Sequence, residues 1–466
     1  MKPIRGLSPR GQGNDLEQAA ELERVEWVVV ALIALVILVF MAHLRWTWFS
    51  DDAYYRDWAA TDGQANGSLA VFLQHRLSNW TSRVAIEAAI FTIVNHIIGW
   101  RIITAFAFWL VVVLPVFLVA RDTGTRIILF PISGLLVLSI PGTVWFDAGL
   151  IATSVNYLWA LAAGLLAAAP AVLFLQKRRC HPILLIASVL AVLFAGSAEI
   201  ISVFLTCLYV ASLGVFVFRI RNSKPSDFGK GLVGYWAVIL IGFALFLSGM
   251  VFFHVTSTGN AARGMPSWRG PTVWVTVEAA YSSTLRQIFM SGYLIPLAFF
   301  LVLTVLCFKR YGFSAMVLIP TAPVIGSLLL RDAYVTGLAA TVFRNSFNDG
   351  NLFWDTNDPA LPQTLFPDNL LTFTVLTLLL LSAIVAILVT IRGPVAWRVL
   401  VVLAAGFVSK FIVVPTIGHA LTITFHRTDL LLLFSFLIAT LIALRHLNIS
   451  RLHPQQSSGL SVCPAQ

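Results

Sequence analysis

The chain has 466 residues, of which 58% are hydrophobic and 11% are charged, and its formal net charge is +10 at pH 7. Soluble domains usually carry about 25% charged residues, so this composition excludes an ordinary soluble protein and indicates a chain that lies mostly in a membrane. A nucleic-acid-binding protein is excluded as well, because the basic residues are scattered over the ends of apolar runs and form no stripe.

Residues 1–24 are polar and mixed in charge, and they are predicted to be a cytoplasmic segment. Beyond them, apolar runs long enough to cross a bilayer core recur along the chain. Such runs must be helices, because lipid offers the backbone no hydrogen-bond partner. The sequence therefore predicts an all-α polytopic membrane protein, with one transmembrane domain at 25–445 and a disordered cytoplasmic tail at 446–466. About twelve spans are expected, at residues 25–46, 102–120, 126–140, 157–176, 182–195, 200–218, 232–253, 288–308, 313–330, 369–391, 396–414 and 430–444.

A further apolar run, Val84–Ile98, decides the topology. If it does not cross, the basic clusters after the fourth, sixth, eighth and tenth predicted spans lie on the same side as the basic N-terminus, as the positive-inside rule requires. The run also contains Glu87, which is costly to bury in lipid. We therefore expect an interfacial helix here and place every long polar connection on the outer face. These connections are 47–101, 141–156, 254–287, 331–368 and 415–429.

The predicted spans contain almost no charge near their centres, which argues against an ion-coupled transporter. Arg398 and Lys410 lie near the ends of one span, where long side chains reach the interface. The chain has no GxxxxGK[ST] phosphate loop, so nucleotide hydrolysis is excluded. Any chemistry must therefore use a substrate that arrives already activated.

Two adjacent aspartates, Asp51 and Asp52, closely follow the first predicted span. One interpretation is a helix cap, with Ser50 or Asp51 beginning a short interfacial helix. The other is that one aspartate is a general base and its neighbour orients it or binds a cation, since two like charges this close raise one pKa. Two adjacent carboxylates supply too few ligands for a divalent cation on their own. The sequence therefore assigns no cofactor, and it leaves open both a cation and the choice of base.

Arg83 and Glu87 are spaced one helical turn apart. One interpretation is a salt bridge between them on the helix surface, and the other is that Arg83 binds a substrate phosphate. Glu199 lies near the middle of an apolar stretch where two helices of ordinary length meet, which predicts the tip of an outer hairpin. There Glu199 is either a polar turn residue or a carboxylate that meets Arg83 or the substrate.

The remaining candidates are polar and aromatic residues on the same predicted face. For Arg344 the alternative is an ordinary solvated loop charge, and for Arg427 it is the anchor of a span end. Each residue is a weak signal by itself, but their shared location predicts one substrate-binding surface. Besides Arg83, its candidates are Tyr54, Asn156, Tyr157, Arg344, His426 and Arg427.

On these residues the chain resembles the GT-C class of polytopic glycosyltransferases. Members of that class carry acidic residues in the first outer loop, just after the first span, followed by interfacial helices. Asp51-Asp52 and Val84–Ile98 stand at those places. More narrowly, the chain is similar to bacterial inner-membrane proteins grouped with O-antigen glucosyltransferases. The features that carry this similarity are Asp51-Asp52-Ala53-Tyr54, Arg83, Ser154-Val155-Asn156-Tyr157-Leu158-Trp159, Glu199 and Arg427.

The resemblance implies a glycosyltransferase whose active face is the periplasmic side of a bacterial inner membrane, with both termini in the cytoplasm. It implies transfer of a sugar from a polyprenyl-phosphate donor to a glycan or lipid acceptor of the cell envelope. A protein acceptor is not favoured, because the chain lacks the large soluble outer domain of oligosaccharyltransferases. The expected partners are the lipid-linked sugar, the acceptor and membrane lipids. Two alternatives stay open: a transporter or flippase of a lipid-linked glycan, and an O-antigen polymerase.

Overall fold

The computed structural model describes residues 10–45, 50–60, 63–64, 66–79, 83–146, 149–176, 178, 180–222, 281, 284–330, 370–391, 393–413 and 429–452. Within these ranges every secondary-structure element is a helix. Each predicted apolar run that falls in them is helical, so the prediction of an all-α chain is confirmed there. The run 232–253, residues 254–280 of the connection 254–287, the connection 331–368 and residues 415–428 of the connection 415–429 lie outside the described residues.

Six described helices are long and apolar enough to cross a membrane, which makes the chain a polytopic membrane protein. They are the second part of α1 (Arg10–His43), α5 (Ile97–Val119), the continuous helical stretch Leu150–Leu173, α14 (Leu294–Tyr311), α18 (Pro394–Val413) and α19 (Leu430–Leu452). Shorter apolar segments lie in α6 (Thr123–Leu138), α10 (Pro182–Ala195), α11 (Glu199–Asn222), α15 (Leu318–Leu330) and α17 (Leu370–Thr390).

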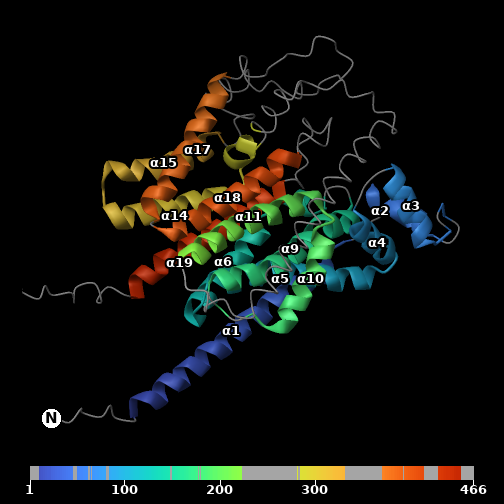
Figure 1. Ribbon diagram of the computed structural model, residues 1–466, viewed down its shortest axis with the longest axis horizontal. Coiled ribbons are helices and arrows are strands. Elements are labelled where there is room, and N and C mark those ends of the chain that lie inside the picture. Colours follow the sequence, from blue (N-terminus) through green and yellow to red (C-terminus); the bar gives the residue numbers. More distant parts are fainter. Residues whose placement is uncertain are drawn as a thin grey trace, which may run out of the picture.

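The helices form one bundle with a small helical cluster at one end. In the bundle, α9 (Ala160–Leu175) packs against α5, α10 and α11, while α19 packs against α14 and α18. Figure 1 shows the short helices α2 (Asp51–Ala59), α3 (Leu69–Asn79) and α4 (Val84–Ile93) gathered at the right-hand end, away from the end of α19. The described residues of the first predicted outer connection therefore form a structured cap on one end of the bundle.

Close helix contact depends on small residues, as is usual where lipid gives helices little hydrophobic reason to associate. At the crossing of α18 and α19, a Cβ added to Gly406 would lie 2.3 Å from Oγ of Ser435. Only glycine allows the two backbones to approach this closely. This packing holds α19 in the core, where most of its residues from Leu430 to Leu441 are buried.

The run Val84–Ile98 is not one helix. Helix α4 has 10 residues, which is about 15 Å of rise and half of a bilayer core. His96 then occupies the N-cap position of α5. The run is therefore too short to cross as α4 alone, in agreement with the sequence analysis. Its Glu87, however, is buried inside the protein.

Two predicted boundaries are tested by helix ends. Helix α10 ends at Ala195 and α11 begins at Glu199, so the predicted break between two helices at Glu199 is confirmed. Helix α19 continues to Leu452, so the first part of the tail predicted to be disordered is helical. The helix is continuous through the predicted boundary at residue 445.

Candidate functional site

Asp52 joins the first connection to the bundle. It is fully buried, and its Oδ1 accepts hydrogen bonds from the backbone N–H groups of Ala152 at 2.8 Å and Ile151 at 3.1 Å. These amides belong to the first turn of α8 (Leu150–Thr153), which starts the stretch Leu150–Leu173. First-turn amides have no acceptor in their own helix, and they form the positive end of its dipole. Asp52 thus caps a helix that begins about 100 residues further along the chain.

Gly149 makes this approach sterically feasible. Its φ is 136°, a region that L residues rarely adopt. A Cβ at this position would lie 2.7 Å from Oδ1 of Asp52 and 2.9 Å from its Cγ. Any side chain at residue 149 would therefore push the carboxylate away from the amides that it caps.

The two aspartates have different environments. Asp51 is exposed, whereas Asp52 is buried. Burial raises the pKa of Asp52, the backbone hydrogen bonds partly oppose this rise, and the charge of Asp51 adds a smaller increase. The direction agrees with the sequence analysis, but the main cause is desolvation and not the neighbouring charge. Ser50 stands at the N-cap of α2 with no side-chain cap hydrogen bond, so a Ser50 cap is wrong.

A buried ionic cluster holds α2, α3 and α4 together. The guanidinium of Arg76 binds both carboxylate oxygens of Glu87, with Nε–Oε2 at 2.8 Å and Nη2–Oε1 at 2.9 Å. The hydroxyl of Tyr55 donates to Oε2 of Glu87 at 2.8 Å and accepts from Arg76 at 3.0 Å. The guanidinium also lies 5.5 Å from the ring centre of Tyr54 and 5.9 Å from that of Phe72, within the range of cation–π attraction.

Glu87 is therefore bound by Arg76 from another helix, and not by Arg83 one turn away as the spacing suggested. Sequence reasoning gave Arg76 no role. The signal that was present is the set of aromatic residues around it, Tyr54, Tyr55 and Phe72, which shield a buried guanidinium from solvent.

Arg83 contacts the start of the helical stretch Leu150–Leu173, which Asp52 caps. Its Nη1 donates to Oδ1 of Asn156 at 3.2 Å, and Nδ2 of Asn156 donates to the carbonyl of Ala152 at 2.8 Å. Asn156 and Tyr157 are in a π-helical turn, Ser154–Trp159, a rare geometry that is frequent at functional sites. The turn is fixed to α5 by a hydrogen bond from Trp100 Nε1 to Ser154 Oγ at 2.8 Å.

The structure thus brings together part of the predicted set. Asp52 binds the backbone of Ile151, Arg83 binds Asn156, and Asn156 binds the carbonyl of Ala152. Tyr54 is on α2 with Asp51. The side chain of Glu199 is not among those described, and Arg344, His426 and Arg427 lie outside the described residues. In the part of the chain that is described, no group of three His, Cys, Asp or Glu residues is placed to hold a metal ion.

Lys410 was expected to reach the membrane interface, and that expectation is wrong. It is 2% exposed and donates a hydrogen bond to Oδ1 of the buried Asp429, whose Oδ2 accepts from the hydroxyl of Tyr293 at 3.2 Å. A carboxylate placed at the start of α19 makes ion pairing more favourable than snorkelling. Lys410 therefore joins the end of α18 to the start of α19.

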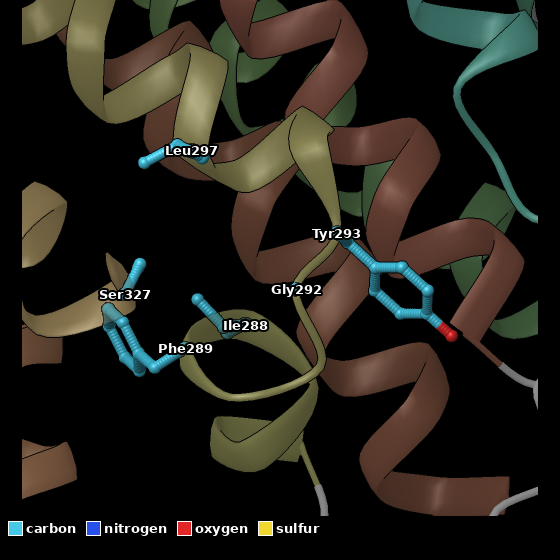
Figure 2. Close-up of a pocket in the computed structure, with 6 residues that line it drawn as sticks. All are labelled: Ile288, Phe289, Gly292, Tyr293, Leu297 and Ser327. Atoms are coloured by element: carbon cyan, nitrogen blue, oxygen red, sulfur yellow. The ribbon is translucent and has the colours of Figure 1, made fainter. Parts of the chain in front are cut away.

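A small cavity is partly lined by Tyr293. Its lining residues are Ile288, Phe289, Gly292, Tyr293, Leu297 and Ser327, and the hydroxyl of Tyr293 points away from the other five (Figure 2). Its empty volume, open space included, is about 230 Å³, which is below the usual size of a ligand pocket. The cavity is therefore too small for a lipid-linked sugar.

The chain matches no protein-family model, no curated protein and no solved structure.

Replacing Asp52 separates its capping role from its charge. Asp52→Ala leaves two buried N–H groups without an acceptor, at about 1–3 kcal/mol each, and is expected to lower the thermal unfolding midpoint of the purified protein. Asp52→Asn retains an oxygen acceptor and is expected to unfold close to the wild type at pH 7. Asp51→Ala, at an exposed position, is the matched control. Equal midpoints for Asp52→Ala and Asp51→Ala would contradict the capping role.

The same variants give a pH dependence. Because the pKa of Asp52 is raised in the folded protein, the folded protein binds this proton more readily than the unfolded chain. Stability due to Asp52 therefore falls as pH rises from about 4 through the raised pKa, and it is constant above that pKa. The difference in unfolding midpoint between wild type and Asp52→Asn should change over this interval. A difference that is constant from pH 4 to pH 7 would show that Asp52 does not titrate there.

The Arg76–Glu87 pair is expected to behave as a unit. Arg76→Met leaves Glu87 buried without its cation, which costs about 3–5 kcal/mol. Adding Glu87→Leu removes that charge and should restore part of the unfolding midpoint. Arg56→Met, at an exposed position on α2, is the control. Additive losses in the double variant, measured by thermal unfolding, would mean that the two residues are not coupled.

Proposed function

We propose that this protein is a GT-C-type glycosyltransferase with about twelve spans, acting at the outer face of a bacterial inner membrane. It moves a sugar from a polyprenyl-phosphate donor to a glycan or lipid acceptor of the cell envelope. The observation that carries the proposal is that the exposed Asp51 directly precedes the buried Asp52, which fixes α2 to the helix start that also carries Asn156 and its partner Arg83.

In this proposal Asp51 is the general base. Asp51 is exposed on a helix that is held in place, so an incoming hydroxyl can approach it, whereas Asp52 is fully buried. Asp52 is then a positioning residue that sets the location of Asp51. Positioned base catalysis contributes roughly two to four orders of magnitude to a rate.

The reaction is a single displacement. Asp51 takes the proton of the acceptor hydroxyl as its oxygen attacks the anomeric carbon. The bond between that carbon and the phosphate oxygen breaks, and the electron pair leaves with the polyprenyl phosphate. Arg83, together with Arg344 and Arg427, neutralises the charge on that phosphate, because a guanidinium fits phosphate oxygens in a fixed fork. This step inverts the configuration at the sugar.

The sugar is bound by the neighbouring residues. Asn156 and Tyr157 are half-buried in the π-helical turn, and Tyr54 is 37% exposed beside Asp51. Amide, hydroxyl and aromatic groups are suited to a pyranose ring, which has polar edges and apolar faces. His426, which lies outside the described residues, is assigned to substrate binding. If Glu199 reaches the anomeric carbon as a second carboxylate, the outcome changes to retention by double displacement.

The test compares two aspartates on one helix. In a strain deleted for the gene, wild-type protein should restore the mass of the envelope glycan or lipid that the deletion changes. Asp51→Asn is expected to reduce this transfer at least about 100-fold. Asp57→Asn, at another exposed position of α2, should restore it fully.

Both variants must insert at wild-type levels, as measured by immunoblot of membranes. Normal transfer by Asp51→Asn would reject the proposed base. Purified protein in liposomes that moves a lipid-linked sugar across the bilayer without forming a new glycosidic bond would reject the transferase and support a flippase.

A further inference from the structure

A second charged cluster lies at the end of the bundle opposite to Asp52. Helix α5 has 23 residues, a rise of about 35 Å, and it runs from α4 to this cluster. Around its last turn gather four arginines from four separate segments. They are Arg121 after α5, Arg126 in α6, Arg178 between α9 and α10, and Arg445 in α19.

Part of this arrangement is helix capping. Arg178 donates to the carbonyl of Phe117 at 2.8 Å, and Arg445 donates to that of Val119 at 2.6 Å. Arg121 donates to the carbonyl of Gln176 at 2.6 Å, just past the end of α9. These carbonyls have no partner within their helices, and they form the negative ends of the helix dipoles. Capping therefore explains one N–H group of each of these arginines.

Capping accounts for only a few of the N–H groups of these arginines, and it does not neutralise their positive charge. Each guanidinium has five N–H groups and does not lose its proton in proteins. The Nε atoms of Arg126 and Arg445 are buried, and within the described residues they have no hydrogen-bond partner. The cluster is also open to solvent on one side, because Arg121 is exposed and Arg178 is half-buried.

Nearby carboxylates do not balance the four guanidinium charges. Glu26 binds Arg126 at 3.0 Å. Asp122 accepts the N–H of Thr125 at 2.8 Å and lies within electrostatic reach of Arg445. In the described part of the chain these two acids are the ones shown at the cluster, so two positive charges remain in excess. The pKa of Arg178 is lowered by burial and by the charges of Arg126 and Arg121, as expected where like charges are crowded.

The surroundings indicate what kind of anion fits. Apolar side chains that follow Arg126 and Arg178 in the sequence, in α6 and α10, are exposed: Ile128 is 52% exposed, Ile183 is 69% exposed and Ile186 is 63% exposed. The cluster itself is at the ends of membrane-crossing helices, which is the depth of lipid headgroups. Guanidinium groups above an outward-facing apolar surface match a phosphate joined to acyl chains.

We propose that this arginine cluster, formed by Arg121, Arg126, Arg178 and Arg445, is a binding site for the phosphate of an anionic membrane lipid. Basic pockets between membrane helices bind such headgroups in the same way. The lipid supplies the negative charge that the cluster lacks and fixes the relative positions of α5, α6, α9 and α19. The site is independent of the proposed transferase activity.

The test measures lipid binding by the full-length protein in detergent. Wild-type protein titrated with phosphatidylglycerol should show a saturable rise in thermal unfolding midpoint. Phosphatidylcholine, whose headgroup carries no net charge, and inorganic phosphate at the same concentration should not produce this rise. The variant Arg121→Gln/Arg178→Gln should bind phosphatidylglycerol about tenfold more weakly or worse, because it loses charge-assisted hydrogen bonds to the phosphate.

Arg101→Gln is the matched control, since Arg101 caps the end of α1 through the carbonyl of Leu44 at 2.9 Å but stands outside the cluster. It should bind phosphatidylglycerol like the wild type. The single variant Arg121→Gln changes an exposed side chain and therefore gives a folded sample if the double variant does not fold. It should also bind phosphatidylglycerol more weakly than the wild type. Wild-type affinity in the cluster variants, or equal stabilisation by inorganic phosphate, would overturn the proposal.

Discussion

The first N–H groups of a helix have no acceptor within the helix, and when they are buried they must find one elsewhere. In this protein the amides of Ile151 and Ala152 find it in Asp52, from α2. The bond requires that the carboxylate reach the helix start without obstruction, which explains the glycine at position 149. Because α2 is held there, Asp51 faces outward at a fixed place. The location of the candidate site therefore follows from the satisfaction of a single helix terminus.

The other contacts at this end of the bundle extend that anchor. The Arg76–Glu87–Tyr55 cluster ties α2, α3 and α4 into one unit, and the bond from Arg83 to Asn156 ties this unit to the π-helical turn. At the opposite end of the bundle, positively charged side chains cap helix C-termini. Arginines bind the last carbonyls of α5 and the carbonyl of Gln176, just past α9. Acids at helix starts and guanidiniums at helix ends are what the helix dipole favours.

The sequence allowed the helices and one connection to be predicted, because hydrophobic length and helix-to-helix turns are local properties. The break between helices at Glu199 follows from two apolar lengths that meet there. The role of Asp52 was not predictable, because its partners are backbone amides with no side-chain signature. The spacing of Arg83 and Glu87 was misleading, since Arg76 reaches Glu87 from another helix. Lys410 was misplaced for the same reason: its partner Asp429 belongs to the next helix.

The most direct test of this account is the amide hydrogen exchange rate of residues 150–153 in the purified protein. If Asp52 caps this helix, these amides exchange slowly in the wild type and at least about tenfold faster in Asp52→Ala, while amides in the middle of α10 are unchanged. Equal exchange in the two proteins at residues 150–153 would contradict the account, because the first connection would then not be anchored through Asp52.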